Sequence, residues 1–198
     1  IANAEKYLDA ANSDPRNQFR RMRAISAHNA FYFLFLANTG GNAASVKDIE
    51  TDGTMEESTS NPGYRSIKWR AQEKVVSVVV PMAFVPSLRR YMELRRYLLN
   101  GKEFPFLFMS VGDVKRNAPT QIGSQVLATQ YQLLLRIDPQ LPRMAARTIR
   151  ATVSDFYHRK HDATIEAAVL QHKEATAEKS YNAGTEADAK QLAATKGN

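Results

Sequence analysis

The sequence predicts a mostly α-helical protein with one small antiparallel β-sheet, in the α+β class. Long apolar or amphipathic segments bounded by proline and glycine indicate several helices. A single pair of neighbouring segments favours β-strands, and a short polar link joins the two as in a hairpin. The chain has 198 residues, of which 43% are hydrophobic, and this is enough for one buried core but short for two. We therefore expect a single main domain.

The first predicted helix spans residues 15–37. Pro15 is tolerated in its first turn, and its second half is almost entirely apolar, so we expect that half to be deeply buried. The segment 39–42 contains two glycines and ends the helix, and residues 43–49 are predicted to form a short second helix. Residues 51–63 are polar and rich in Ser, Thr and Gly, which predicts an exposed loop.

The hairpin and the remaining helices follow in order. Residues 64–70 and 75–80 are predicted to be two strands joined by residues 71–74, and Pro81 ends the second strand. A helix from Pro86 to Gly101 comes next. After a loop over 104–119, the predicted helices are 121–136, 142–158, 163–171 and 175–181, and the tail from residue 185 is predicted to form a short, weakly stable helix.

The charge balance is basic, with 27 Lys and Arg residues against 20 Asp and Glu and a formal net charge of +7. Such a charge favours a polyanionic partner, because neutralising phosphates releases condensed counterions. The chain has no cysteine, which excludes disulfides and thiolate metal sites. His158 and His161 lie in a basic run without a further set of ligands, so no metal site is predicted.

No segment predicts a membrane span or a signal peptide. The longest apolar run, residues 30–37, is far shorter than the roughly 20 residues that cross a bilayer. We therefore expect a cytoplasmic protein. The chain does not begin with Met, so we also expect the full-length protein to be longer.

The segment from Arg147 to Tyr181 carries the side chains best suited to a phosphate ester. Arg147 and Arg150 lie one turn apart on a predicted helix, and Tyr181 follows His172 by nine residues. If the helices of this segment pack together, Arg150, His172 and Tyr181 converge on one point. An arginine, a histidine and a tyrosine are all side chains suited to handling a phosphate.

The order of these motifs resembles the catalytic domain of the tyrosine recombinases, the phage-integrase family. The resemblance rests on the helix break at Thr39-Gly40, the lysine-bearing hairpin, the Arg147-x-x-Arg150 helix, the Leu170-Gln171-His172 turn and Tyr181. It covers roughly residues 15–184. We therefore expect residues 1–184 to form a tyrosine-recombinase-like catalytic domain, and the tail 185–198 to dock on a neighbouring subunit.

The resemblance implies a reaction and a role for each matched residue. Tyr181 attacks a DNA phosphodiester and forms a 3′-phosphotyrosyl link with release of a 5′-hydroxyl, and no metal or nucleotide cofactor is needed. Arg150 matches the second arginine of the family, which holds the non-bridging phosphate oxygens. His172 matches the histidine that donates a hydrogen bond to the phosphate, although Gln171 stands where the family has glycine.

A hairpin lysine serves the family as the general acid that protonates the leaving 5′-oxygen. Lys74 is the expected residue here, and Lys68 is the alternative. A lysine near a hairpin tip is also compatible with a merely solvated charge.

Two positions depart from the family pattern. Asn42 stands where the family has its first arginine, and replacing a charged donor by an amide costs about 1.5 to 3 kcal/mol. Arg147 stands where the family has a histidine, and an arginine cannot act as a base. We expect Arg147 to supply the charge that Asn42 lacks, with Lys47 as another source.

The leading functional interpretation is therefore site-specific DNA recombination or integration by a bacterial or phage-derived recombinase, of a phage or mobile element, although no motif separates these from a chromosomal system. The resemblance implies double-stranded DNA as the partner, an upstream core-binding domain in the same full-length chain and a homotetramer on DNA. The alternative is a DNA-binding module that keeps the fold and has lost strand cleavage, as Asn42 and Arg147 suggest. A weaker possibility is a helical protein-interaction domain. The target DNA sequence is not encoded in any motif that we recognise.

Overall fold

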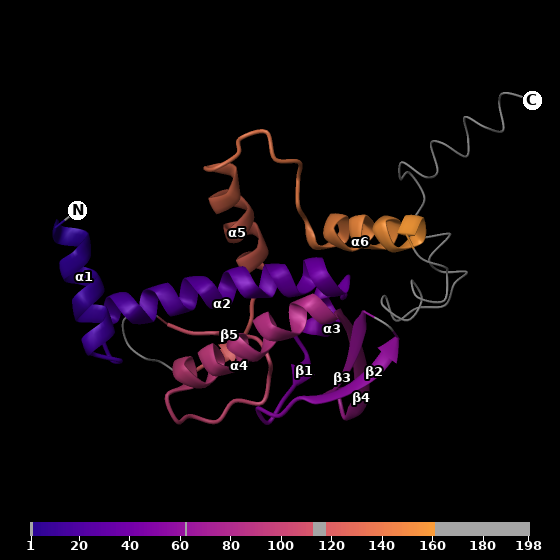
Figure 1. Cartoon of the computed structure of the whole chain (residues 1–198), viewed down its shortest axis with the longest axis horizontal. Coiled ribbons are helices and arrows are strands. Elements are labelled where there is room, and N and C mark those ends of the chain that lie inside the picture. The colour runs from indigo at the N-terminus through magenta and orange to yellow at the C-terminus, as the bar shows by residue number, and fades with distance from the viewer. Residues whose placement is uncertain (1, 62, 113–117, 161–198) are drawn as a thin grey trace, which may run out of the picture.

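The computed structural model describes residues 2–61, 63–112 and 118–160 of the chain. Within these residues it confirms a mostly α-helical fold with a small antiparallel sheet (Figure 1). The elements run in the order α1 (Ala2–Ser13), α2 (Gln18–Thr39), α3 (Ala43–Val46), β1 (Ile49–Glu50), β2 (Glu56–Asn61), β3 (Tyr64–Ala71), β4 (Lys74–Pro81), η1 (Met82–Phe84), α4 (Val85–Leu99), β5 (Met109–Ser110), β6 (Thr120–Gln121), α5 (Gln125–Leu135) and α6 (Ala146–Lys160).

The long helix α2 runs through the middle of the molecule (Figure 1). It begins at Asn17, whose side chain accepts hydrogen bonds from the amides of Phe19 and Arg20, so the cap satisfies two donors that the helix leaves unpaired. It ends at Gly40, which adopts the left-handed conformation (φ 60°) that a residue with a side chain rarely takes. Most of the apolar second half is buried as predicted, with Phe35 and Leu36 at 0% and 1% exposure, whereas Leu34 is 49% exposed.

Aromatic rings from α2, η1 and α4 form the centre of the core. The ring of Phe31 stacks on Tyr91 at 4.3 Å and on Phe84 at 5.4 Å, and Phe35 meets Phe108 edge-on at 5.2 Å. The buried Tyr91 hydroxyl donates to the carbonyl of Leu107 at 2.8 Å, so its polar atom is satisfied inside the core. This stacking fixes α4 against α2.

Strand β3 is the centre of the four-stranded sheet. Its first half pairs with β2, its last residues pair with β1, and β4 pairs with its whole length on the other side. A two-residue turn, Gln72-Glu73, joins β3 to β4, so the predicted hairpin is confirmed with a tighter turn than expected. Both turn residues have positive φ, at 50° and 66°.

The register decides which face of the sheet each hairpin lysine occupies. Ile67 and Trp69 are buried in the core, and Ala71 lies on the same face two residues further on. Lys74 pairs with Ala71, so it lies at the exposed end of this core-facing side. Lys68 alternates with the buried residues and therefore lies on the opposite face.

Several local predictions are wrong. Residues 51–63 are not a loop throughout, because β2 (Glu56–Asn61) pairs with β3 there. The predicted helix 43–49 ends at Val46, and Ile49 and Glu50 form the short strand β1. Thr120 and Gln121 form β6, so α5 begins only at Gln125. Helix α1 was not predicted.

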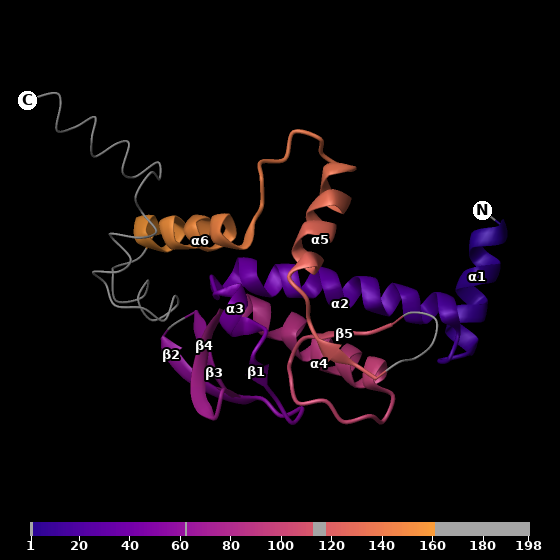
Figure 2. The same ribbon diagram turned by 180° about the vertical axis from the view of Figure 1, so that it is seen from behind.

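The last two described helices lie on the far side of α2 from the sheet. Helix α5 projects away from the body, and α6 lies over the carboxyl end of α2, as both views show (Figures 1 and 2). The predicted helices 163–171 and 175–181 and the tail lie outside the described residues. Within the part of the chain that the structure describes, no helix is long and apolar enough to cross a membrane.

Candidate active site

The turn that follows α2 is held by its own hydrogen bonds. The Thr39 hydroxyl donates to the carbonyl of Phe35 at 2.8 Å and accepts a hydrogen bond from the amide of Gly41 at 3.1 Å. Gly41 has no room for a side chain, because a Cβ atom there would lie 2.6 Å from Cγ2 of Val46. The sequence Thr39-Gly40-Gly41 therefore builds a compact turn.

Arg150 of α6 reaches this turn. Its Nη1 atom donates to the carbonyl oxygen of Gly40 at 3.0 Å, although the two residues are 110 positions apart in the chain. The neighbouring Ile149 is buried in the main core, which fixes this turn of α6 against the body. The side chain of Arg150 is half-buried, so the carbonyl contact orients its guanidinium group at the edge of the turn.

Asn42 lies two residues beyond the carbonyl that Arg150 contacts. Its side-chain oxygen accepts a hydrogen bond from the amide of Ala44 at 3.0 Å and thereby caps α3. The residue is exposed, and its side-chain nitrogen donates to no residue that the structure describes. Asn42 thus has a structural role through its side-chain oxygen.

Arg147 lies one turn before Arg150 on α6. Residues spaced by three share a helix face, so the two guanidinium groups belong to one side of the helix. Arg147 is exposed and forms no hydrogen bond or ion pair with a described residue. Its charge is therefore not neutralised by a described residue.

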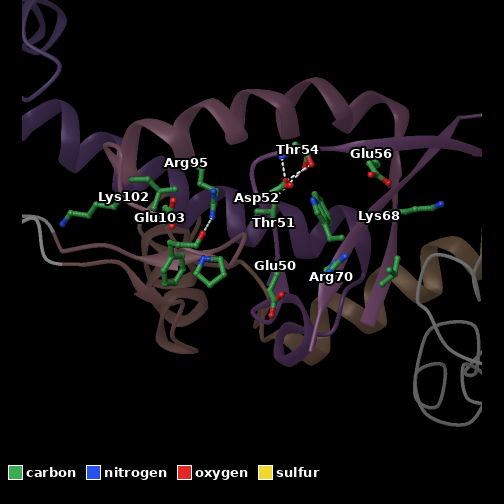
Figure 3. A pocket seen from close by; sticks show the side chains of 15 residues that line it. Glu50, Thr51, Asp52, Thr54, Glu56, Lys68, Arg70, Arg95, Lys102 and Glu103 are labelled. Atoms are coloured by element: carbon green, nitrogen blue, oxygen red, sulfur yellow. Dashed lines mark hydrogen bonds between the residues drawn. The ribbon is translucent and has the colours of Figure 1, made fainter. Parts of the chain in front are cut away.

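The two candidate lysines are both exposed and lie on opposite faces of the sheet. Lys74 is the first residue of β4, directly after the Gln72-Glu73 turn. Lys68 lines an open pocket with a volume of about 1040 Å³ on the other face (Figure 3). No contact between either lysine and Arg150 occurs among the described residues.

The pocket beside Lys68 carries charges of both signs (Figure 3). Its cationic lining residues are Lys68, Arg70, Arg95 and Lys102, and its carboxylates are Glu50, Asp52, Glu56 and Glu103. Arg95 is 5% exposed and donates from Nη2 to the carbonyls of Phe104 at 2.6 Å and Phe106 at 2.8 Å. This arginine therefore holds the segment after α4 through backbone carbonyls.

His172 and Tyr181, which the sequence predicts as site residues, lie outside the described residues. Lys47, the other predicted source of charge, follows α3, and its carbonyl accepts a hydrogen bond from Gln121. Within the ranges that the structure describes, no cluster of three or more His, Asp or Glu side chains is arranged to hold a metal ion.

Buried tyrosines of the core are poorly suited to act as nucleophiles. Burial raises the pKa of Tyr32 to about 12 and raises the pKa values of Tyr91 and Tyr157 further above the ordinary value of a phenol. Each of these hydroxyls therefore stays protonated at neutral pH.

A polar cluster beside the hairpin turn was not predicted from the sequence. The carboxylate of Asp48 accepts a hydrogen bond from Nε2 of Gln121 at 2.7 Å and another from Nε2 of Gln72 at 3.1 Å. Asp48 thus joins the segment after α3 to the β3–β4 turn and to β6. No motif marks these residues, because they are distant in sequence and the local pattern around Asp48 favours a helix.

The sequence matches no protein-family model, and it matches no curated protein sequence. Solved structures, in contrast, share its fold. A XerH site-specific recombinase bound to its difH substrate in a pre-cleavage complex matches with a TM-score of 0.56 at 16% identity, over 96% of this chain and 51% of that chain. A XerA recombinase matches with a TM-score of 0.56 at 15% identity, over 90% of this chain and 63% of that chain.

The chain therefore has the fold of the tyrosine-recombinase catalytic domain. It spans about half the length of the XerH chain and somewhat more of the XerA chain.

Proposed function

We propose that this chain is the catalytic part of a site-specific tyrosine recombinase that cleaves and rejoins double-stranded DNA through a 3′-phosphotyrosyl intermediate. The observation that carries the proposal is the contact of Arg150 with the carbonyl of Gly40, on a recombinase fold. The contact brings an arginine of α6 to the turn where the family keeps its other phosphate ligand. The similarity to a XerH recombinase bound to its DNA substrate supports the same conclusion.

The reaction exchanges one phosphodiester for another. The hydroxyl oxygen of Tyr181 attacks the phosphorus, its proton passes to solvent or a base, and a new P–O bond to the tyrosine forms. The bond from phosphorus to the 5′-oxygen breaks, its electron pair stays on that oxygen, and Lys74 donates a proton to it. The stored phosphotyrosyl ester is then attacked by the 5′-hydroxyl of another strand, so no external energy source or cofactor enters the balance.

The charge of the transition state is carried by the two arginines of α6. The guanidinium group of Arg150 makes two parallel charge-assisted hydrogen bonds to the phosphate oxygens, and Arg147 on the same helix face adds the charge that Asn42 lacks. Asn42 contributes its side-chain NH2 group, since its oxygen already caps α3. His172 donates a further hydrogen bond to the phosphate.

The remaining parts of the proposal concern assembly. A net charge of +7 suits a DNA ligand, whose affinity for the protein falls with salt as counterions are released. The upstream core-binding domain of the full-length chain completes the clamp around the duplex. Four subunits assemble on DNA, and the tail 185–198 docks on the neighbour.

The test is the capture of a covalent protein–DNA adduct. A pool of nicked duplexes with randomised sequence is incubated with the protein, so that cleavage near the nick releases a short piece and traps the tyrosyl ester. Denaturing gels then separate covalent complexes, and sequencing of the captured DNA yields one preferred duplex for kinetics.

We expect an adduct with the parent protein and none with Tyr181→Phe, which keeps the aromatic ring and removes the nucleophilic oxygen. Salt-dependent DNA binding without any adduct would overturn the catalytic proposal and favour the alternative of a DNA-binding module. Binding to DNA that does not weaken between low and high salt would contradict both.

A further inference from the structure

The carboxylate of Asp48 connects three separate parts of the chain. One oxygen accepts from Gln121 of β6 at 2.7 Å, and the other accepts from Gln72 in the β3–β4 turn at 3.1 Å. The same Gln121 nitrogen also contacts the carbonyl of Lys47 at 3.2 Å, which fixes the glutamine beside Asp48. Each of the two carboxylate oxygens therefore holds a different neighbouring element.

The turn that Asp48 holds is one that its own residues do not favour. Gln72 and Glu73 both adopt positive φ, at 50° and 66°, where glycine, asparagine and aspartate are preferred. A left-handed conformation of residues with longer side chains persists only where surrounding contacts hold it. The hydrogen bond from Gln72 to Asp48 is such a contact.

Helix α3 links this turn to the arginine site. The helix begins at the Asn42 cap, next to the carbonyl that Arg150 contacts, and Asp48 follows its end. Helix α3 covers only Ala43–Val46, and Lys47 and Asp48 follow it as a turn. The short segment from Asn42 to Asp48 therefore connects the Gly40 turn to the residue that holds Gln72, and Lys74 directly follows the Gln72-Glu73 turn.

We propose that Asp48 is a positioning residue that locks the β3–β4 turn and so presents the ammonium group of Lys74 to the leaving 5′-oxygen. This inference rests on the proposed function, because it assigns a partner to the general acid of that reaction. Asp48 itself touches neither substrate nor reacting atoms. Gln121 fixes the Asp48 side chain by donating a hydrogen bond to its other carboxylate oxygen.

The role concerns one proton. As the bond from phosphorus to the 5′-oxygen breaks, the electron pair on that oxygen takes a proton from the Lys74 ammonium, which becomes a neutral amine. A 5′-sulfur at the same position leaves as a thiolate without protonation, because a thiol has a pKa of about 8.5. The demand for a general acid is thus removed by changing one atom of the substrate.

The first arm of the test compares these two substrates. With the 5′-oxygen duplex, Lys74→Ala is expected to cleave about 100-fold more slowly than the parent, as for loss of a general acid. Asp48→Ala retains the lysine and is expected to cleave about 10-fold more slowly. With the 5′-sulfur duplex, both variants are expected to match the parent, whereas damage to DNA binding or folding would slow cleavage of both substrates.

Asp52→Ala is the matched control. Asp52 is an exposed aspartate nearby in the chain that accepts two hydrogen bonds, both from Thr54 within its own turn. The control loses the same charge and a similar number of hydrogen bonds without touching the hairpin turn, so it should cleave both duplexes at the parent rate. Asp48→Asn, which keeps one acceptor oxygen, should recover part of the rate on the 5′-oxygen duplex.

The second arm is independent of catalysis. A lysine-specific protease is applied to the folded proteins, and mass spectrometry follows cleavage after Lys74. Release of the turn should raise this rate about 10-fold in Asp48→Ala and leave it unchanged in Asp52→Ala, since proteolysis tracks the open population.

Equal rates of proteolysis in Asp48→Ala and the parent would show that Asp48 does not hold the β3–β4 turn. Faster proteolysis together with unchanged cleavage of the 5′-oxygen duplex would overturn its role in catalysis. A parent protein that cleaves neither duplex would overturn the proposed function, and with it the assignment of a catalytic role to Asp48.

Discussion

Gly41→Ala is the substitution that most directly perturbs the turn on which Arg150 rests. A Cβ atom at this position would lie 2.6 Å from Cγ2 of Val46 and 3.1 Å from the Thr39 hydroxyl. Val46 is buried and belongs to the main core, so it has little room to withdraw. Overpacking of this kind costs about 1 to 3 kcal/mol of unfolding free energy.

The same displacement acts on function, because the carbonyl of Gly40 precedes the altered residue and accepts the hydrogen bond of Arg150. A shift of the turn misplaces the guanidinium group, and we expect DNA cleavage to slow at least about 10-fold. The expected loss of stability corresponds to a Tm decrease of roughly 2 to 4 °C for each kcal/mol. Denaturant unfolding and single-turnover cleavage measure the two effects separately.

Gly123→Ala is the control, since nothing lies within 4 Å of its Cβ position. Its unfolding free energy should stay within about 0.5 kcal/mol of the parent. The double variant Gly41→Ala with Val46→Ala removes the clash, so it should be less destabilised than the sum of the single variants. Parent-like stability of Gly41→Ala, or strict additivity in the double variant, would refute this account of the turn.

Three further predictions concern charge and protonation. His28 is 1% exposed, and its burial lowers its pKa to about 4, although a hydrogen bond to Asn29 opposes the shift. As the pH falls below about 6.5, the histidine therefore binds a proton in the unfolded chain before it does so in the folded protein. Its contribution reduces the unfolding free energy by roughly 2 kcal/mol between pH 8 and pH 5, and a chemical-denaturation series should show a smaller decrease in His28→Gln than in the parent. Arg147→Ala should slow DNA cleavage by about one to two orders of magnitude, because it removes charge at the phosphate. Cleavage at the parent rate would exclude the proposal that Arg147 supplies the charge that Asn42 lacks. Lys74→Ala should slow cleavage of a 5′-oxygen substrate far more than Lys68→Ala, because Lys68 lies on the opposite face of the sheet. The reverse order of the single-turnover rates would assign the general acid to Lys68.

The elements with strong local signals were predictable from the sequence. The β-branched run of β4 forms a strand as predicted, and most of the apolar second half of α2 is buried as expected. Strand β2 was missed because its residues, Glu56–Asn61, are polar and have low strand preference. Its pairing depends on β3, a neighbour that no local pattern within β2 reveals. Tertiary pairing therefore decided the structure of this segment.

In the candidate site, too, local features were predictable from the sequence and long-range contacts were not. Arg150 was identified from its motif, but its contact with Gly40 depends on packing between residues 110 positions apart. The role of Asn42 as the cap of α3 is a local preference that the sequence already contains. The Asp48 cluster was not predictable, because its three members come from separate elements and each is common on protein surfaces.

The central claim is that a phosphotyrosyl bond forms at Tyr181, and mass spectrometry of the trapped adduct tests it most directly. Digestion with nuclease and a lysine-specific protease leaves the peptide 180–190, which begins with Ser180-Tyr181. We predict that this peptide carries a nucleotide through a 3′-phosphate on the tyrosine. An adduct on another residue, or an unmodified peptide from a protein that binds the same DNA, would contradict the account.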